Sequence, residues 1–131
     1  MKLAFKHKKM VKLCVLCPRK PDLKLELFED HWKNVFGPLF SSQPEVKLYV
    51  KKYIQVHSTG KELKEEFLPV SDYDGIAEIW FERMEDIPKV FSSENFKNII
   101  AKDEAKFIDR GNIKWIYATE NMVIVSLRYI P

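Results

Sequence analysis

The sequence has no apolar run approaching the roughly 18 residues that a membrane-spanning helix needs. It also has no glycine-rich phosphate loop, no dinucleotide fingerprint and no serine nucleophile elbow. Lysines interrupt any apolar stretch near the N-terminus, so the pattern of a secretory signal is missing. These absences predict a cytoplasmic protein that makes no membrane contact and needs no cofactor for its chemistry.

Cysteine is scarce as well, because only Cys14 and Cys17 are present, in a C-x-x-C spacing. A zinc site would need two more ligands, and a redox motif would need the cysteines at the start of a helix. The residues around them predict a strand, which points the two side chains to opposite faces. We expect free, buried or half-buried thiols and no metal site. Three acidic residues around Phe107 are expected to form a solvated helix face: Asp103, Glu104 and Asp109.

The charge is nearly balanced, with 22 basic and 19 acidic residues and a net charge of +3. Much of the excess lies in residues 1–12, which contain no arginine and no repeated aromatic platform. This pattern predicts a solvated basic tail over residues 1–10 and no nucleic-acid partner. The remaining residues, 11–131, have no Gly/Ser-rich linker and fit one domain with one core.

The hydrophobic period predicts the first half of the fold. An alternating run predicts a strand over 11–16, and apolar residues at three- and four-residue steps predict a helix over 23–39. Asp22 is the expected N-cap, and the helix is expected to end near Gly37-Pro38. Alternation resumes over 46–57, which predicts a second strand, and residues 58–71 read as a long loop or a short helical piece.

The second half repeats the order. Residues 75–81 are apolar on both faces except for Glu78, which predicts a central strand. A helical region starts at 86–91, and Ser92 or Ser93 is the expected cap of a second long helix. Residues 113–119 and 122–127 read as strands.

The predicted class is therefore α+β, with the ferredoxin-like order βαββαβ and a four-stranded antiparallel sheet carrying helices on one face. The other face of such a sheet would leave apolar side chains in water. A homodimer that closes two sheets into a dimeric α+β barrel would cover that face.

The three histidines are informative because their unperturbed pKa lies nearest neutrality. His7 falls in the basic tail. His31 lies on the apolar face of the first helix, where it is either a packed core residue or a catalyst. His57 follows Tyr53 and Gln55 in strand phase, which indicates either an exposed edge strand or a cavity lining. Both histidines in one pocket would form an acid/base pair, with Tyr53 donating to a developing oxyanion.

The segment Tyr73-Asp74-Gly75 precedes the central strand. It reads as a turn in which Asp74 bonds nearby backbone, or as part of the pocket wall. We expect an aromatic pocket for a small-molecule substrate, with seven residues besides the catalytic candidates: Trp32, Phe36, Gln55, Tyr73, Asp74, Ile79 and Phe81.

Several short motifs, taken in this order along the chain, resemble the EthD-domain family of dimeric α+β barrel proteins. They are Pro18-Arg19-Lys20-Pro21, Phe28-Glu29-Asp30-His31-Trp32, Gly37-Pro38-Leu39, Lys52-Tyr53-Ile54-Gln55-Val56-His57, Tyr73-Asp74-Gly75-Ile76-Ala77-Glu78-Ile79-Trp80-Phe81, Asp103-Glu104 and Phe107-Ile108-Asp109. The motifs look most like the branch of polyketide pathways, whose small proteins act as decarboxylases, dehydratases or cyclases on phenolic substrates.

This resemblance implies a cofactor-free lyase or cyclase acting on a polyketide-like or aromatic molecule through histidine-mediated proton transfer. One departure is that the family pattern carries a histidine just before the Gly-Pro-Leu, where this chain has Phe36. Two alternatives follow from the same resemblance: a cofactor-free monooxygenase acting on a phenol, and a non-catalytic accessory barrel that binds small molecules.

Overall fold

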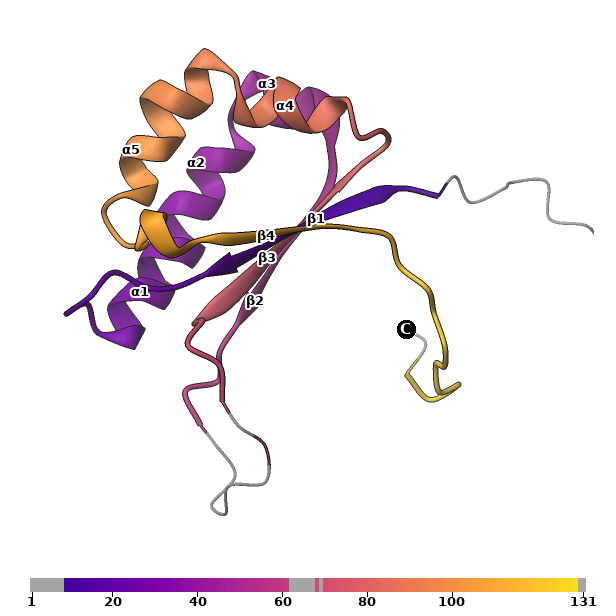
Figure 1. The fold of residues 1–131 in the computed structure, drawn as a ribbon, viewed down its shortest axis with the longest axis horizontal. Coiled ribbons are helices and arrows are strands. Elements are labelled where there is room, and N and C mark those ends of the chain that lie inside the picture. Colours follow the sequence, from indigo (N-terminus) through magenta and orange to yellow (C-terminus); the bar gives the residue numbers. More distant parts are fainter. Residues whose placement is uncertain (1–8, 62–67, 69, 130–131) are drawn as a thin grey trace, which may run out of the picture.

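The computed structural model describes residues 9–61, 68 and 70–129 (Figure 1). Its centre is an antiparallel sheet of four strands: β1 (Val11–Cys17), β2 (Val50–His57), β3 (Gly75–Phe81) and β4 (Lys114–Ala118). The strand order is β2-β3-β1-β4. β3 therefore lies inside the sheet, as its two apolar faces predict, and the predicted antiparallel sheet is confirmed.

The helices lie on one face of this sheet (Figure 1). Three consecutive elements form the first long helix: α1 (Leu25–His31), η1 (Trp32–Phe36) and α2 (Gly37–Ser41). Two more form the second: η2 (Phe96–Ile100) and α5 (Ala101–Glu104). Shorter helices are α3 (Pro44–Tyr49), α4 (Asp86–Phe91) and η3 (Arg110–Asn112). The predicted α+β, ferredoxin-like class is confirmed.

The core fills the space between this helix layer and the sheet. Alternate strand residues point into it, so Leu13 of β1 lies opposite Ile79 of β3, and Val15 lies opposite Ala77. Burying one such side chain contributes about 1.5–3 kcal/mol. The largest fully buried side chains are mostly aromatic: Trp32, Phe28, Phe40, Phe81 and Phe107.

The first helix begins and ends later than predicted. Its N-cap is Lys24, without a side-chain cap, while Asp22 has a left-handed φ of 67° before the helix. The expected stop at Gly37-Pro38 is also wrong. The N–H of Gly37 bonds to the carbonyl of Trp32, five residues back, so a π-turn replaces the usual pattern there. Pro38 then sits in the first turn of α2, where its missing N–H is tolerated.

The predicted strand over 46–57 is wrong in its first part. Residues 44–49 form α3, because Pro44 occupies a first-turn position that favours a helix. The register shifts between Val50 and Lys52, so the alternation is broken before Tyr53. From Tyr53 onward the prediction holds, and the odd-numbered side chains of β2 face the helices.

The C-terminal prediction is only half right. β4 covers the middle of the predicted strand 113–119, but residues 122–127 form no strand and leave the sheet (Figure 1). Met122, Val123 and Ile124 are 78–87% exposed. The predicted cap at Ser93 is present, since its Oγ accepts the N–H of Phe96 at 3.1 Å.

The expectations for the tail, the long loop, the cysteines and a membrane span remain. Most of the predicted tail (1–8) and the centre of the predicted loop (62–67, 69) lie outside the described residues. The two cysteines are free, with Cys17 buried and Cys14 half-buried, as the strand prediction requires. No described helix is both long and apolar enough to cross a bilayer.

Candidate functional site

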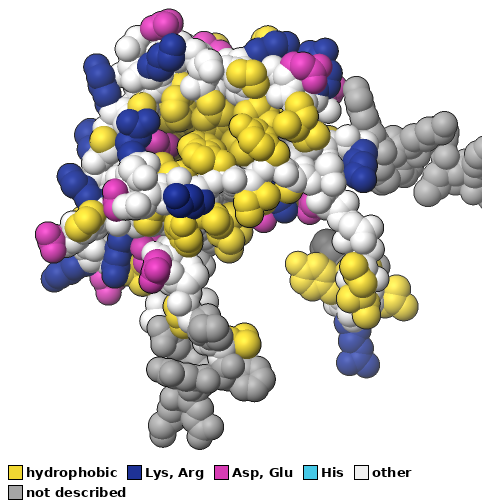
Figure 2. Space-filling view, in the orientation of Figure 1, with side chains coloured by type: hydrophobic (Ala, Val, Ile, Leu, Met, Phe, Trp, Pro, Cys, Tyr) yellow, Lys and Arg dark blue, Asp and Glu magenta, His cyan; other side chains and the backbone are white. Residues whose placement is uncertain are grey.

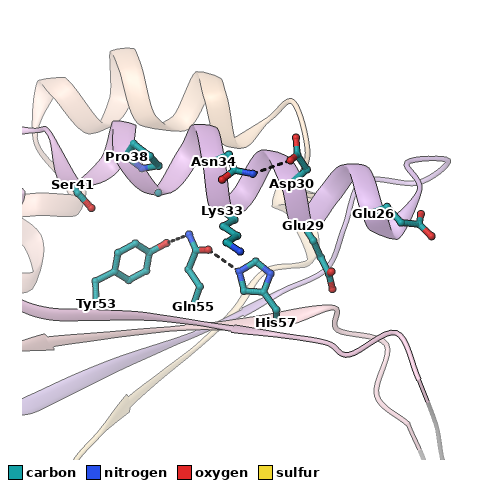
Figure 3. Close-up of a pocket in the computed structure, with 11 residues that line it drawn as sticks. Glu26, Glu29, Asp30, Lys33, Asn34, Pro38, Ser41, Tyr53, Gln55 and His57 are labelled. Atoms are coloured by element: carbon teal, nitrogen blue, oxygen red, sulfur yellow. Dashed lines mark hydrogen bonds between the residues drawn. The ribbon is translucent and has the colours of Figure 1, made fainter.

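An open groove of about 990 Å³ runs between the first long helix and β2 (Figure 3). One wall is the helix, whose polar residues recur at three- and four-residue steps. The other wall is β2, which contributes three side chains in strand phase: Tyr53, Gln55 and His57. The helix wall consists of Glu26, Glu29, Asp30, Lys33, Asn34, Gly37, Pro38 and Ser41.

The three β2 side chains form a continuous hydrogen-bonded chain (Figure 3). The Nε2 amide group of Gln55 donates to the hydroxyl oxygen of Tyr53 at 2.9 Å and to the main-chain carbonyl of Trp32 at 2.9 Å. Its Oε1 lies 2.8 Å from Nε2 of His57. The alternation of β2 places them side by side, because residues two apart share a face.

The indole of Trp32 forms the floor beneath His57. The two ring centroids are 4.5 Å apart, and Trp32 is only 1% exposed. Gly75 of β3 makes this packing possible, since a Cβ there would lie 2.4 Å from the indole. His57 is therefore held from below by packing and from one side by Gln55.

The charged side chains near His57 shift its pKa in opposite directions. Burial lowers the pKa of His57, and Lys33 lowers that pKa further, while Glu29 raises it. Burial has the largest effect, so the neutral ring is favoured at neutral pH. One carboxylate oxygen of Glu29 is buried and has no hydrogen-bond partner among the described residues. Glu29 also lines the groove, so its carboxylate group belongs to the wall that a ligand would contact.

Tyr53 separates the groove from a small inner cavity between sheet and helices. Burial raises the pKa of the Tyr53 phenol, so the hydroxyl keeps its proton at neutral pH. The inner cavity measures about 20 Å³, enough for roughly one water molecule. Its lining includes three residues predicted to bind substrate: Trp32, Phe36 and Ile79.

His31 does not share the groove with His57. Its Nε2 lies 3.0 Å from a carboxylate oxygen of Asp103, and its ring packs against Phe107 at 4.7 Å. These contacts join the first long helix to the end of the second. The structure therefore separates the two histidines that the sequence suggested as a pair.

The remaining predicted residues fall into two groups. Tyr73 and Asp74 line a cavity of about 200 Å³ on another side of His57. Asp74 also accepts the main-chain N–H of Arg19 at 3.0 Å, a residue 55 positions away, and not the nearby backbone that the turn reading expected. Phe81 is fully buried and packs against Phe91, so it belongs to the core.

The solvated acidic face predicted near the C-terminus is wrong for two of its three members. Asp103 is 5% exposed and Glu104 is 7% exposed. Asp103 is buried by its contact with His31, and Glu104 pairs with Arg110 at 3.0 Å while lining the inner cavity. Burial raises the pKa of Glu104. Among the described residues, no three His, Cys, Asp or Glu side chains cluster in a way that could hold a metal ion.

Sequence reasoning missed the helix wall of the groove. The signal was present, because Glu29 and Lys33 are four residues apart, and Ser41 follows Gly37 at the same step. Such a polar stripe reads equally well as a solvent-facing helix side. Only the position of β2 opposite the stripe makes it a groove wall.

Comparisons with known proteins agree with this fold. The EthD domain model matches residues 20–111. A conidial pigment biosynthesis dehydratase EthD from Metarhizium robertsii is 29% identical over 104 residues, which cover 74% of this chain and 72% of that protein. Decarboxylase claH from Passalora fulva is also 29% identical over 104 residues, covering 74% of this chain and 67% of that protein.

Solved structures show the same architecture. An EthD-family protein from Bacillus halodurans superposes with a TM-score of 0.60 at 20% identity, covering 86% of this chain and 99% of that one. A protein from Bacteroides fragilis described as dimeric, with a ferredoxin-like fold, gives a TM-score of 0.59 at 14% identity, covering 85% and 96%. At these identities the likeness concerns the fold alone.

Proposed function

Because the chain belongs to the EthD-domain family, we propose that it is a lyase that breaks a C–C or C–O bond beside a carbonyl group by proton transfer, without a cofactor. The observation that carries this proposal is the chain His57–Gln55–Tyr53 along one wall of the groove. It places a proton acceptor, His57, and a hydroxyl donor, Tyr53, on the same wall of a groove large enough for a small molecule. Two relatives named as a dehydratase and a decarboxylase support the reaction class.

His57 moves the proton in this mechanism, and Tyr53 holds the negative charge. In a dehydration, neutral His57 takes a proton from the carbon beside the carbonyl, and Tyr53 donates a hydrogen bond to the enolate oxygen. The β-hydroxyl leaves with the proton that the imidazolium returns, which gives water. Acid/base catalysis of this kind contributes about 10²–10⁴ to the rate.

A decarboxylation uses the same groups in a different order. The carboxylate of a β-keto acid releases CO₂, and the electron pair moves onto the carbonyl oxygen beside Tyr53. Neutral His57 first takes the carboxyl proton of the β-keto acid, and after CO₂ has left, the imidazolium delivers that proton to the carbon. Because both reactions pass through an enolate, one site geometry serves either.

The substrate that we propose is a small aromatic or polyketide-like molecule. The groove volume lies at the upper end of the range typical of small-molecule sites. The carboxylate of Glu29 on the groove wall suits a substrate hydroxyl, and Lys33 suits an acidic group or enolate. Trp32 beneath His57 supplies an aromatic floor.

The assembly that we propose is a homodimer in which two sheets pack through their helix-free faces. The residues of this face include Ile54, Val56 and Ile116, which are 38–51% exposed. Covering them with a second copy would remove this apolar surface from water. The description of the Bacteroides fragilis protein as dimeric supports a dimer.

The test of the reaction uses purified protein with two probes: benzoylacetic acid for decarboxylation and the aldol of benzaldehyde and acetone for dehydration. The wild type should release CO₂ from the first or an enone from the second, and His57→Ala should lose about 10²-fold or more of that rate. Tyr53→Phe should lose less, because it removes only one hydrogen bond to the enolate.

Oxygen consumption separates this proposal from the monooxygenase alternative, since a lyase turns over without oxygen. If turnover stops under nitrogen, the protein is not a lyase. Binding of either probe without conversion would favour the accessory barrel, which the replacement of a family histidine by Phe36 also favours. Phe36 is 6% exposed and packs against Phe40 and Phe107, so it offers no proton-transfer group.

A further inference from the structure

The orientation of the Gln55 amide follows from its partners. The carbonyl oxygen of Trp32 only accepts hydrogen bonds, so the atom 2.9 Å from it must be the NH₂ group of Gln55. The same NH₂ group reaches the Tyr53 hydroxyl at 2.9 Å. The other end of the amide, Oε1, is thereby turned toward His57.

This orientation determines which ring nitrogen of His57 carries the proton. Oε1 of Gln55 only accepts, so the Nε2 atom 2.8 Å away must be an N–H donor. In the neutral imidazole the other nitrogen, Nδ1, then has a free lone pair. No described residue donates a hydrogen bond to Nδ1.

We infer that Gln55 is a positioning residue, pinned by the Trp32 carbonyl, that holds neutral His57 in the Nε2–H tautomer and leaves Nδ1 as the proton acceptor. The same amide donates to Tyr53, so the phenol proton stays free to point at a ligand. One side chain thus sets both the base and the hydroxyl donor. Its catalytic consequence rests on the proposed function, whereas the tautomer itself does not.

The π-turn of the first helix leaves little room beside the Trp32 carbonyl. The N–H of Gly37 reaches that carbonyl from five residues away, and Gln55 approaches the same oxygen from β2. A Cβ on Gly37 would lie 3.1 Å from Nε2 of Gln55 and 3.3 Å from the Trp32 oxygen. Glycine at this position therefore leaves room for the amide.

Other groups around His57 act on its charge and not on its tautomer. Glu29 and Lys33 face it from the first helix and shift its pKa in opposite directions. Tyr73 and Asp74 lie near it before β3 and share a cavity with it. The indole of Trp32 contacts the ring face. Of these, none is hydrogen-bonded to a ring nitrogen of His57.

The test is a two-dimensional ¹H–¹⁵N spectrum of the histidine rings, recorded without substrate above the pKa of His57. The chain has three histidines, and the loss of one set of signals in His57→Asn assigns the ring. Wild-type His57 should show a single protonated nitrogen, Nε2. Gln55→Leu should give a mixture of both tautomers, because no acceptor then holds the proton on Nε2.

Two further variants sharpen the result. Gln55→Glu keeps an acceptor facing Nε2, so the Nε2–H tautomer should persist while the pKa of His57 rises above its wild-type value. Gly37→Ala should displace the amide and shift the spectrum toward that of Gln55→Leu. The matched control is Gln43→Leu, because Gln43 also donates to a helix carbonyl, that of Leu39, but lies outside the groove.

A protonated Nδ1 in wild-type His57, or an unchanged tautomer ratio in Gln55→Leu, would overturn the inference. In turnover, Gln55→Leu should lose about ten- to a hundredfold of kcat and shift the acid limb of the pH profile, while Gln43→Leu should not. If the tautomer behaves as expected but His57→Ala turns over normally, the proposed function fails and the positioning role stands.

Discussion

His57 shows how the surroundings of one side chain define the site. Its ring rests on Trp32, its Nε2 faces Gln55, and Glu29 and Lys33 place opposite charges nearby. Burial outweighs those charges and favours the neutral ring. A half-buried histidine with a lowered pKa is suited to accept a proton at neutral pH.

The lowered pKa of His57 predicts how stability depends on pH. The unfolded chain has an ordinary histidine pKa of about 6.5, so it binds a proton more readily than the folded protein does. The free energy of unfolding should therefore fall as pH drops below about 6.5. In urea titrations between pH 7 and 5, His57→Gln should reduce this slope; equal slopes would contradict the burial effect.

Gly75 predicts a steric cost at the floor of the site. A Cβ there would meet the Trp32 ring at 2.4 Å and the main-chain oxygen of Val56 at 2.9 Å. Gly75→Ala should lower the free energy of unfolding by about 1–3 kcal/mol or more through overpacking. Gly111→Ala is the matched control, because no atom lies within 4 Å of its Cβ. Equal stability of the two variants in urea would refute the steric argument.

At the level of elements, the first long helix serves two neighbours. Its polar stripe forms the groove wall opposite β2, and His31 on another side contacts Asp103 of α5. The π-turn in the middle lets the chain continue through Pro38 to Ser41. The helix therefore both shapes the site and ties it to the second helix.

The contact between His31 and Asp103 predicts a structural role. His31→Leu keeps apolar packing against Phe107, but among the described residues it leaves the buried Asp103 with Lys106, at 3.7 Å, as its remaining side-chain partner. The free energy of unfolding should fall by about 1.5–3 kcal/mol, with turnover unchanged. Asn98→Ala removes an exposed contact to Glu94 and should stay within about 0.5 kcal/mol. Lost turnover in a folded His31→Leu protein would restore the catalytic reading of this residue.

At the scale of the whole molecule, apolar surface gathers away from the groove. Figure 2 shows it between the helices and β4, and again on the C-terminal segment. On the helix-free face, Trp80 is covered by Lys12 and Lys52, whose ammonium groups lie 4.7 and 4.6 Å from its ring, and its Nε1 donates to Glu120. The rest of that face includes the exposed Ile116.

The proposed dimer predicts that a charge on this face blocks assembly. Ile116→Lys would place an ammonium group in the apolar interface, where desolvation without a partner is costly. Analytical ultracentrifugation should show a wild-type dimer and a monomeric variant. Leu48→Lys is the control, since Leu48 is 62% exposed on α3 in the helix layer and should leave the dimer intact. A monomeric wild type at all concentrations would remove the dimer from the proposal.

The sequence by itself determined the fold class and the face of β2. Alternation over Tyr53, Gln55 and His57 needs only the two-residue period of a strand, and the apolar run of β3 needs only burial on both sides. Both signals are local, and both predictions agree with the structure. Local signals also misled at two places: at Gly37-Pro38 a π-turn carries the helix onward, and at Pro44 the proline starts a helix.

Only the tertiary structure decided which polar residues meet. Glu29 and Lys33 became a groove wall because β2 lies opposite them, and His31 left the pair because its side of the helix faces α5. Asp103 and Glu104 became buried because ionic partners offset the cost of removing them from water. The partner of Asp103 is His31, 72 positions away, and the partner of Glu104 is Arg110, six positions away. A sequence period fixes the direction of a side chain within its element, and the packing of elements fixes what that side chain contacts.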